Sequence, residues 1–142
     1  MAERIIVRQN NAFETEVLAS DAHQTGPEAL RPVEHLHGLT PYGMLLASLG
    51  SCTAILLHTY AQRHGLDLRV VELRLRYGRD FKSDCEDCDV NDRYEERIDL
   101  EIGLTGGLAA DEREKLLLIA KQCPIHRLLK SGIEVRSQPV SD

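Results

Sequence analysis

TPYGMLLASLGSCTAILLHTYAQRHG, residues 40–65, is the longest stretch of the sequence that is apolar on nearly every helical face. Thr40 and Pro41 predict a helix start. A hydroxyl N-cap accepts a hydrogen bond from a free backbone amide, and proline at the first helical position has no amide hydrogen to leave unpaired. Gly65 predicts its end. Between them apolar side chains recur at i, i+4 and i+7 and also cover the flanks. We therefore expect a long helix over residues 40–64 that is buried on all sides and crosses the molecule.

The middle of this helix, ASLGSCTA, is a run of small side chains. Gly50 within it costs about 1 kcal/mol relative to alanine in a helix interior. That cost predicts the close approach of another element or of a second subunit. Cys52 lies in the same run. A buried free cysteine is more often a small core side chain than a reactive group, so a partner residue is needed to favour chemistry there.

The composition predicts one domain over residues 1–142 with an aliphatic core, since Trp is absent and Phe occurs twice. A formal net charge of −6 argues against a nucleic-acid partner. The apolar run between Gly43 and His58 is too short for a membrane span, which needs about 20 residues. The N-terminus does not resemble a signal peptide. We expect a soluble, cytoplasmic protein whose four cysteines are reduced, catalytic or metal-bound.

Four segments predict strands: residues 4–8, 13–19, 71–77 and 98–104. The last two alternate between apolar and polar side chains, as half-buried strands do. The first two predict a hairpin around Asn10 and Asn11. The last two predict a longer hairpin in which a basic outer face lies opposite an acidic one. Residues 20–39 predict a loop with one short strand near 32–35. The expected fold class is α+β, with a twisted antiparallel sheet, the long helix buried against it, and helices from 111–130 alongside.

Cys85 and Cys88 form a C-x-x-C pair in the connection of the longer hairpin. This spacing fits half a zinc site or a redox pair, yet the surrounding carboxylates would raise the pKa of both thiols by like-charge repulsion. Three interpretations stay open: an exposed acidic loop, a metal site and a redox site. His23, His35 and His37 are weaker metal candidates, because no further ligand stands at a suitable spacing.

The C-terminal third predicts a helix that begins near Asp111 and breaks at Cys123 and Pro124, because proline lacks the amide hydrogen and restricts the residue before it. A short helix then runs to Lys130 and a last strand covers residues 133–137. Cys123 is expected at the N-cap of the short helix, with His126 and Arg127 within one turn. A thiolate in that place is stabilised, so Cys123 has local reasons to be reactive.

Cys52 and Cys123 could form a disulfide only if the fold brought them together. A peroxidase mechanism would then be available. One thiolate attacks a hydroperoxide and becomes a sulfenic acid, and the other thiol condenses with it to a disulfide that an external dithiol reduces. This chemistry needs no bound cofactor and no metal.

The segments GLTPYGMLLASLGSCTA at 38–54 and KQCPIHR at 121–127 resemble the OsmC/Ohr family, osmotically induced protein C and organic hydroperoxide resistance protein. The predicted order of strands and helices is similar too. The resemblance implies an intertwined homodimer in which Cys52 is the peroxidatic cysteine and Cys123 resolves it.

The family activates its first cysteine with an arginine and with a glutamate just after the start of the long helix. Tyr42 and Gly43 stand there in this chain, which favours the OsmC-like branch. Candidates to supply the missing groups are Arg8 or Arg31 for the arginine, Glu34 for the carboxylate, and His126 to orient a thiol. The leading hypothesis is a cysteine-based peroxidase acting on organic or hydrogen peroxides. The alternative is a non-enzymatic homodimer that binds a small apolar ligand in the same cleft.

Overall fold

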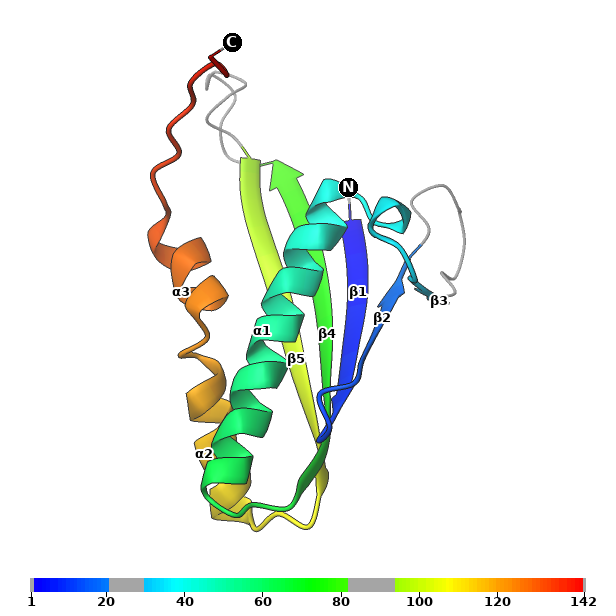
Figure 1. The fold of residues 1–142 in the computed structure, drawn as a ribbon, viewed down its shortest axis with the longest axis vertical. Helices are drawn as coiled ribbons and strands as arrows, with labels where there is room; N and C mark the ends of the chain where they lie inside the picture. Colours follow the sequence, from blue (N-terminus) through cyan, green and yellow to red (C-terminus); the bar gives the residue numbers. More distant parts are fainter. Residues whose placement is uncertain (1, 21–29, 82–93, 142) are drawn as a thin grey trace.

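The computed structural model describes residues 2–20, 30–81 and 94–141 of the chain. Its strands and helices follow one another as β1 (Ala2–Asn10), β2 (Thr15–Ala19), β3 (Arg31–Pro32), the 3-10 helix η1 (Leu36–Gly38), α1 (Pro41–Arg63), β4 (Leu68–Phe81), β5 (Tyr94–Gly106), α2 (Ala110–Ala120) and α3 (Pro124–Ser131) (Figure 1). The fold is α+β, as the sequence predicts. The predicted short strand is wrong in part, because β3 lies one residue earlier than expected and a 3-10 turn follows it.

The strands form one five-stranded antiparallel sheet in the order β3-β2-β1-β4-β5. Helix α1 lies along one face of this sheet, against β1 and β4, and α2 and α3 lie along α1 (Figure 1). The core sits between α1 and the sheet, where alternate residues of the strands are buried. The fold thus leaves a space bordered by α1, β5 and α3, which becomes the site described below.

The outer face of the sheet is charged, and the predicted pairing of a basic face with an acidic one is confirmed. Arg74 pairs with Glu101 and Arg76 with Asp99 across β4 and β5, so basic residues face acidic ones. Hydrogen-bonded ion pairs also join neighbours along one strand, as between Arg74 Nε and Glu72 at 2.9 Å. This face is accordingly solvated, and the apolar side chains lie on the face that α1 covers.

Gly50 is explained by the sheet of its own chain. A Cβ atom at Gly50 would lie 2.7 Å from Val7 Cγ2 on β1 and 2.9 Å from Leu75 Cδ1 on β4. The predicted close approach is therefore real, but its partners are side chains of the sheet. Of the two predicted partners of Gly50, another element of the same chain is the one observed, so Gly50 does not argue for a second subunit.

Helix α1 begins as predicted, with Thr40 Oγ1 accepting a hydrogen bond from the Gly43 amide at 3.0 Å. It is not buried on all sides, since Met44 is 39% and Ile55 is 48% exposed. Among the described helices α1 alone is long and apolar enough to cross a membrane, a property that core helices of soluble proteins share. Here α1 contacts β1 and β4 and covers the core of the domain.

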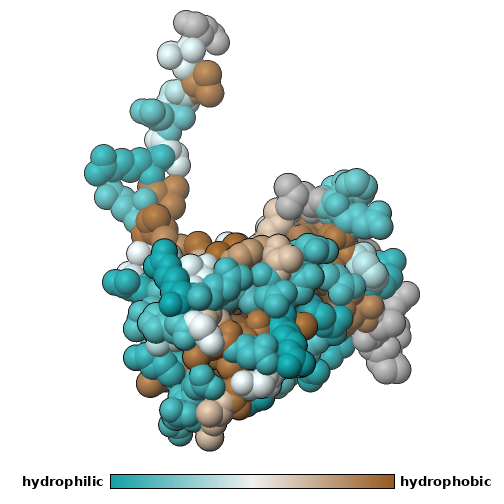
Figure 2. All heavy atoms as spheres, turned by 60° about the horizontal axis from the view of Figure 1, so that its bottom comes forward, coloured by the Kyte–Doolittle hydropathy of each residue, from teal (hydrophilic) through white to brown (hydrophobic). Residues whose placement is uncertain are grey.

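The predicted last strand is wrong. Residues 132–141 follow α3 without regular structure, and Ile133 and Val135 are 67% and 79% exposed. Figure 2 shows this segment standing away from the body of the molecule. A strand forms only when another strand pairs with it, and no described strand of this chain lies beside the segment. The segment therefore alternates as a strand does, but it has no strand to pair with among the described residues of one chain.

Candidate active site

Two helices position the cysteines. Cys52 lies near the middle of α1, on the face that also carries Leu45 and Leu49, and is half-buried. Cys123 lies at the N-cap of α3, with φ −54° and ψ 128°, because Pro124 ends the preceding helix and starts the next. The Cys123 side chain is completely buried. The predicted helix break is therefore confirmed, and it turns Cys123 toward α1.

The fold brings the two thiols together. The Cys123 thiol and the backbone N–H of Ile125 both lie close enough to the Cys52 thiol to affect its pKa, Cys123 upward and Ile125 downward. Both cysteines are free thiols. Two side chains far apart in the sequence thus meet where α1 and α3 are in contact. The two-cysteine mechanism requires the two thiols to be neighbours in this way.

The environment of Cys52 in the single chain disfavours its thiolate form. Burial, and after it the hydrogen bond with Cys123, raises the pKa of the Cys52 thiol above its ordinary value. The Ile125 amide acts in the opposite direction, because it stabilises the thiolate. A thiolate is the attacking species in reactions with peroxides, so Cys52 needs further activation for rapid turnover.

We expect alkylation of Cys52 by iodoacetamide to be slow at neutral pH and to rise only above about pH 8.5, the usual thiol range. Replacing Cys123 with alanine removes one cause of the raised pKa, so the rise should shift to lower pH. The measurement is the alkylated fraction of the peptide that carries Cys52, determined by mass spectrometry. The pH is varied from about 6 to about 10, which spans the pKa of an unperturbed thiol. A reactivity that is already maximal at neutral pH would contradict this description of Cys52.

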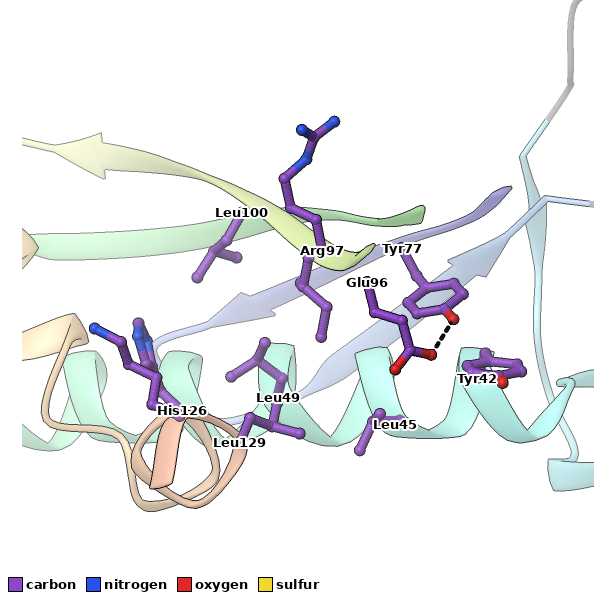
Figure 3. A pocket seen from close by; sticks show the side chains of 11 residues that line it. Tyr42, Leu45, Leu49, Tyr77, Glu96, Arg97, Leu100, His126 and Leu129 are labelled. Atoms are coloured by element: carbon purple, nitrogen blue, oxygen red, sulfur yellow. Dashed lines mark hydrogen bonds between the residues drawn. The ribbon is translucent and has the colours of Figure 1, made fainter. Parts of the chain in front are cut away.

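A cavity of about 660 Å³ adjoins the cysteine pair. It is bordered by α1, β4, β5 and α3, and its lining includes Tyr42, Leu45, Leu49, Tyr77, Glu96, Ile98, Leu100, His126 and Leu129 (Figure 3). Leu49 lies one helical turn before Cys52, and His126 one turn after Cys123. Neither cysteine lines the cavity itself, and the lining residues nearest to them in the sequence are Leu49 and His126.

The other end of this cavity is polar. The Tyr77 hydroxyl donates a hydrogen bond to Glu96 Oε1 at 2.7 Å, and the Tyr42 ring stacks on Tyr77 with centroids 4.4 Å apart (Figure 3). Burial, and after it the Glu96 carboxylate, holds the pKa of Tyr77 well above its usual range. Sequence reasoning missed the contact between Tyr77 and Glu96. The signal was Glu96 itself, a charged residue in phase with the inward-facing Ile98 and Leu100.

The other candidates from the sequence lie elsewhere in the single chain. Arg8 is on the outer face of the sheet, where its Nε bonds Glu72 at 3.0 Å. Arg31 and Glu34 line a separate hollow with His35 and His37. Of the proposed supporting residues, the cavity beside the thiols therefore contains only His126.

Metal ligation finds no support in the described part of the chain, where no three His, Cys, Asp or Glu side chains gather as a site. His35 and His37 stack with ring centroids 5.4 Å apart and do not converge on a third such group. Cys85, Cys88 and His23 lie outside the described residues.

A family model described as OsmC-like protein matches residues 34–138. The chain belongs to the OsmC-like family. The matched region includes α1 with Cys52 and the helix break at Cys123. No curated protein sequence matches the chain.

A solved structure supports the fold of this OsmC-like protein. An osmc-like hydroperoxide resistance protein from Jannaschia sp. CCS1 superposes with a TM-score of 0.63 at 16% sequence identity. The match covers 99% of this chain and 95% of that one. At this identity the likeness establishes a shared fold over nearly the whole chain.

Proposed function

We propose that this OsmC-like protein is a thiol-dependent peroxidase that reduces organic or hydrogen peroxides through Cys52 and Cys123. The observation that carries the proposal is the pair of neighbouring free thiols at the contact of α1 with α3. The description of its structural relative as a hydroperoxide resistance protein agrees with this chemistry. We place the protein in the cytoplasm, where thiols stay reduced.

The difference in burial between the two cysteines supports a separate role for each. Cys52 is half-buried and Cys123 completely buried, so a peroxide reaches Cys52 first. The Cys52 thiolate attacks the distal oxygen of the hydroperoxide, the O–O bond breaks, and the alkoxide takes a proton and leaves as an alcohol. Cys52 is then a sulfenic acid. Cys123 attacks its sulfur, water leaves, and the resulting disulfide is reduced by an external dithiol, which is itself oxidised to a disulfide.

The test is turnover. Purified protein with a small dithiol and an alkyl hydroperoxide should consume peroxide continuously, and without the dithiol it should consume about one equivalent per chain and stop. Consumption no faster than that of the dithiol alone would remove the peroxidase proposal. The alternative function would then apply, in which the same cavity binds a small apolar ligand and both cysteines serve as packing residues. The raised pKa of Cys52 and the many apolar side chains lining the cavity favour that alternative.

We further propose that the working unit is a homodimer. Within one chain the segment 132–141 has no partner, although Ile133 and Val135 alternate with charged residues as a strand would. A second copy offers this segment a surface, and it could also bring the cation that Cys52 lacks. We expect sedimentation to give twice the mass of the chain, and truncation after Gly132 to give a monomer with slower peroxide consumption. A full-length chain that sediments as a monomer at assay concentration would contradict the dimer.

A further inference from the structure

A hollow at the N-terminal end of α1 contains a buried carboxylate. The hollow has a volume of about 250 Å³ and lies between β1, β2, β3 and the first turn of α1 (Figure 1). Its lining includes Glu3, Ile5, Ala19, Arg31, Leu39 and Thr40. From Thr40 to Cys52 the helix rises about 18 Å at about 1.5 Å per residue, so this hollow is separate from the cysteine pair.

The carboxylate belongs to Glu3, which lies on the inward face of β1 with Ile5 and Val7 and is 6% exposed. No hydrogen bond or ion pair joins its side chain to another described residue. Burying an unpaired carboxylate is costly, and buried charges in proteins are as a rule paired. The Glu3 carboxylate is therefore placed to accept hydrogen bonds from a cationic group of a ligand.

The cross-strand neighbours of Glu3 on β4 do not provide such a group. Tyr77 lies directly opposite Glu3 in the register of β1 and β4, and it donates its hydroxyl proton to Glu96. Arg79, farther along the same face of β4, lies opposite Glu96 and has a partner of its own. Neither Tyr77 nor Arg79 pairs with the Glu3 carboxylate.

Arg31 places a positive charge in the same hollow. Ile5 pairs with Ala19, and Ala19 pairs with Arg31, across β1, β2 and β3. These side chains share the face of the sheet on which Glu3 lies, because residues opposite one another point to the same side. Both charged residues line the hollow, but these two described side chains form no ion pair with each other. The hollow thus has a buried carboxylate and, at its rim, an exposed guanidinium.

The two charges define what a ligand must carry. An ammonium group next to Glu3 and a carboxylate next to Arg31 would each form charge-assisted hydrogen bonds. Arg31 has a partner already, but a guanidinium has five N–H donors and can bind a further carboxylate. A ligand with the ammonium alone would face the positive charge of Arg31, and one with the carboxylate alone would leave Glu3 unpaired.

We propose that this hollow binds a small zwitterion of the amino-acid class with an apolar side chain. Its ammonium group bonds Glu3, its carboxylate bonds Arg31, and its side chain lies against Ile5 and Leu39. The ligand is small, because a volume of about 250 Å³ is below the range of sites for drug-sized molecules. This site is additional to the cysteine pair and does not depend on the proposed peroxidase.

A matched set of molecules with one carbon skeleton tests the proposal. L-Leucine, 3-methylbutylammonium, which lacks the carboxylate, and 4-methylpentanoate, which lacks the ammonium, are each titrated into the full-length protein by calorimetry. We expect L-leucine to bind about 10-fold or more tighter than 4-methylpentanoate, with the amine between them. Glu3→Gln should abolish that preference. Arg31→Gln should lower the affinity for L-leucine to that of the amine.

The matched control is Glu16→Gln, which removes the same charge beside Arg8 on the outer face of the sheet and should leave all three affinities unchanged. Circular dichroism of each variant verifies that it folds. The proposal is overturned by an absence of L-leucine binding up to about 20 mM, by 4-methylpentanoate binding as tightly as L-leucine, or by an unchanged preference in Glu3→Gln. Peroxide consumption is measured separately, so a protein that binds L-leucine but consumes no peroxide loses only the proposed peroxidase.

Discussion

Replacing Cys52 with serine is expected to lower the rate of peroxide consumption by a factor of about 10³ or more, the loss that follows removal of a catalytic nucleophile. A serine hydroxyl is not ionised near neutral pH and cannot form a sulfenic acid. Cys123 does not substitute for Cys52, because its side chain is completely buried. The measurement is the initial rate of alkyl hydroperoxide loss in the presence of a dithiol.

The matched control is Cys123→Ser, which keeps the attacking thiol. This variant should consume one equivalent of peroxide at a rate similar to that of the parent and then stop at a sulfenic acid, which dimedone traps at Cys52. Retention of the parental rate by Cys52→Ser would contradict the assignment. The oxidised thiols would then be sought at Cys85 and Cys88.

Replacing Gly50 with valine is expected to lower the free energy of unfolding by about 3 kcal/mol, because overpacking a filled core strains it by that order. A Cβ atom there would already lie 2.7 Å from Val7 Cγ2, and the β-branched Val7 side chain has little freedom to move. Gly50→Ala should also destabilise, although helix propensity alone predicts a gain of about 1 kcal/mol. Urea unfolding followed by circular dichroism measures both.

Gly78→Ala on β4 is the matched control, since a Cβ atom at Gly78 meets nothing within 4 Å. Its stability should equal or exceed that of the parent. A stabilised Gly50→Ala protein would mean that α1 lies farther from the sheet than the structure places it. The contact of Cys52 with Cys123 would then be in question too, because α1 positions one of the two thiols.

The elements that the sequence predicts well are those with a local cause. Alternation defines the strands at 71–77 and 98–104 and predicts that a basic outer face lies opposite an acidic one, because successive side chains of a strand point to opposite faces. The helix break at Cys123 follows from the chemistry of proline. These features depend on neighbours in the sequence and so need no knowledge of the fold.

The features that the sequence did not predict depend on contacts between distant residues. The segment at 133–137 has the alternation of a strand, but whether it pairs depends on what lies beside it. The contact of Tyr77 with Glu96 follows from the register of β4 and β5, which residue patterns alone leave open. The position of Arg8, by contrast, was predictable from the sequence. Its place between the inward-facing Val7 and Gln9 already indicated the outer face, remote from any thiol on α1.

Disulfide mapping tests the central claim most directly. Reduced protein is treated with one equivalent of an alkyl hydroperoxide, blocked with iodoacetamide, digested without reductant and analysed by mass spectrometry. The proposed mechanism predicts one cross-linked peptide that joins Cys52 to Cys123, with Cys85 and Cys88 alkylated. Cys52 and Cys123 both recovered as alkylated thiols, or a bond between Cys85 and Cys88 in their place, would contradict it.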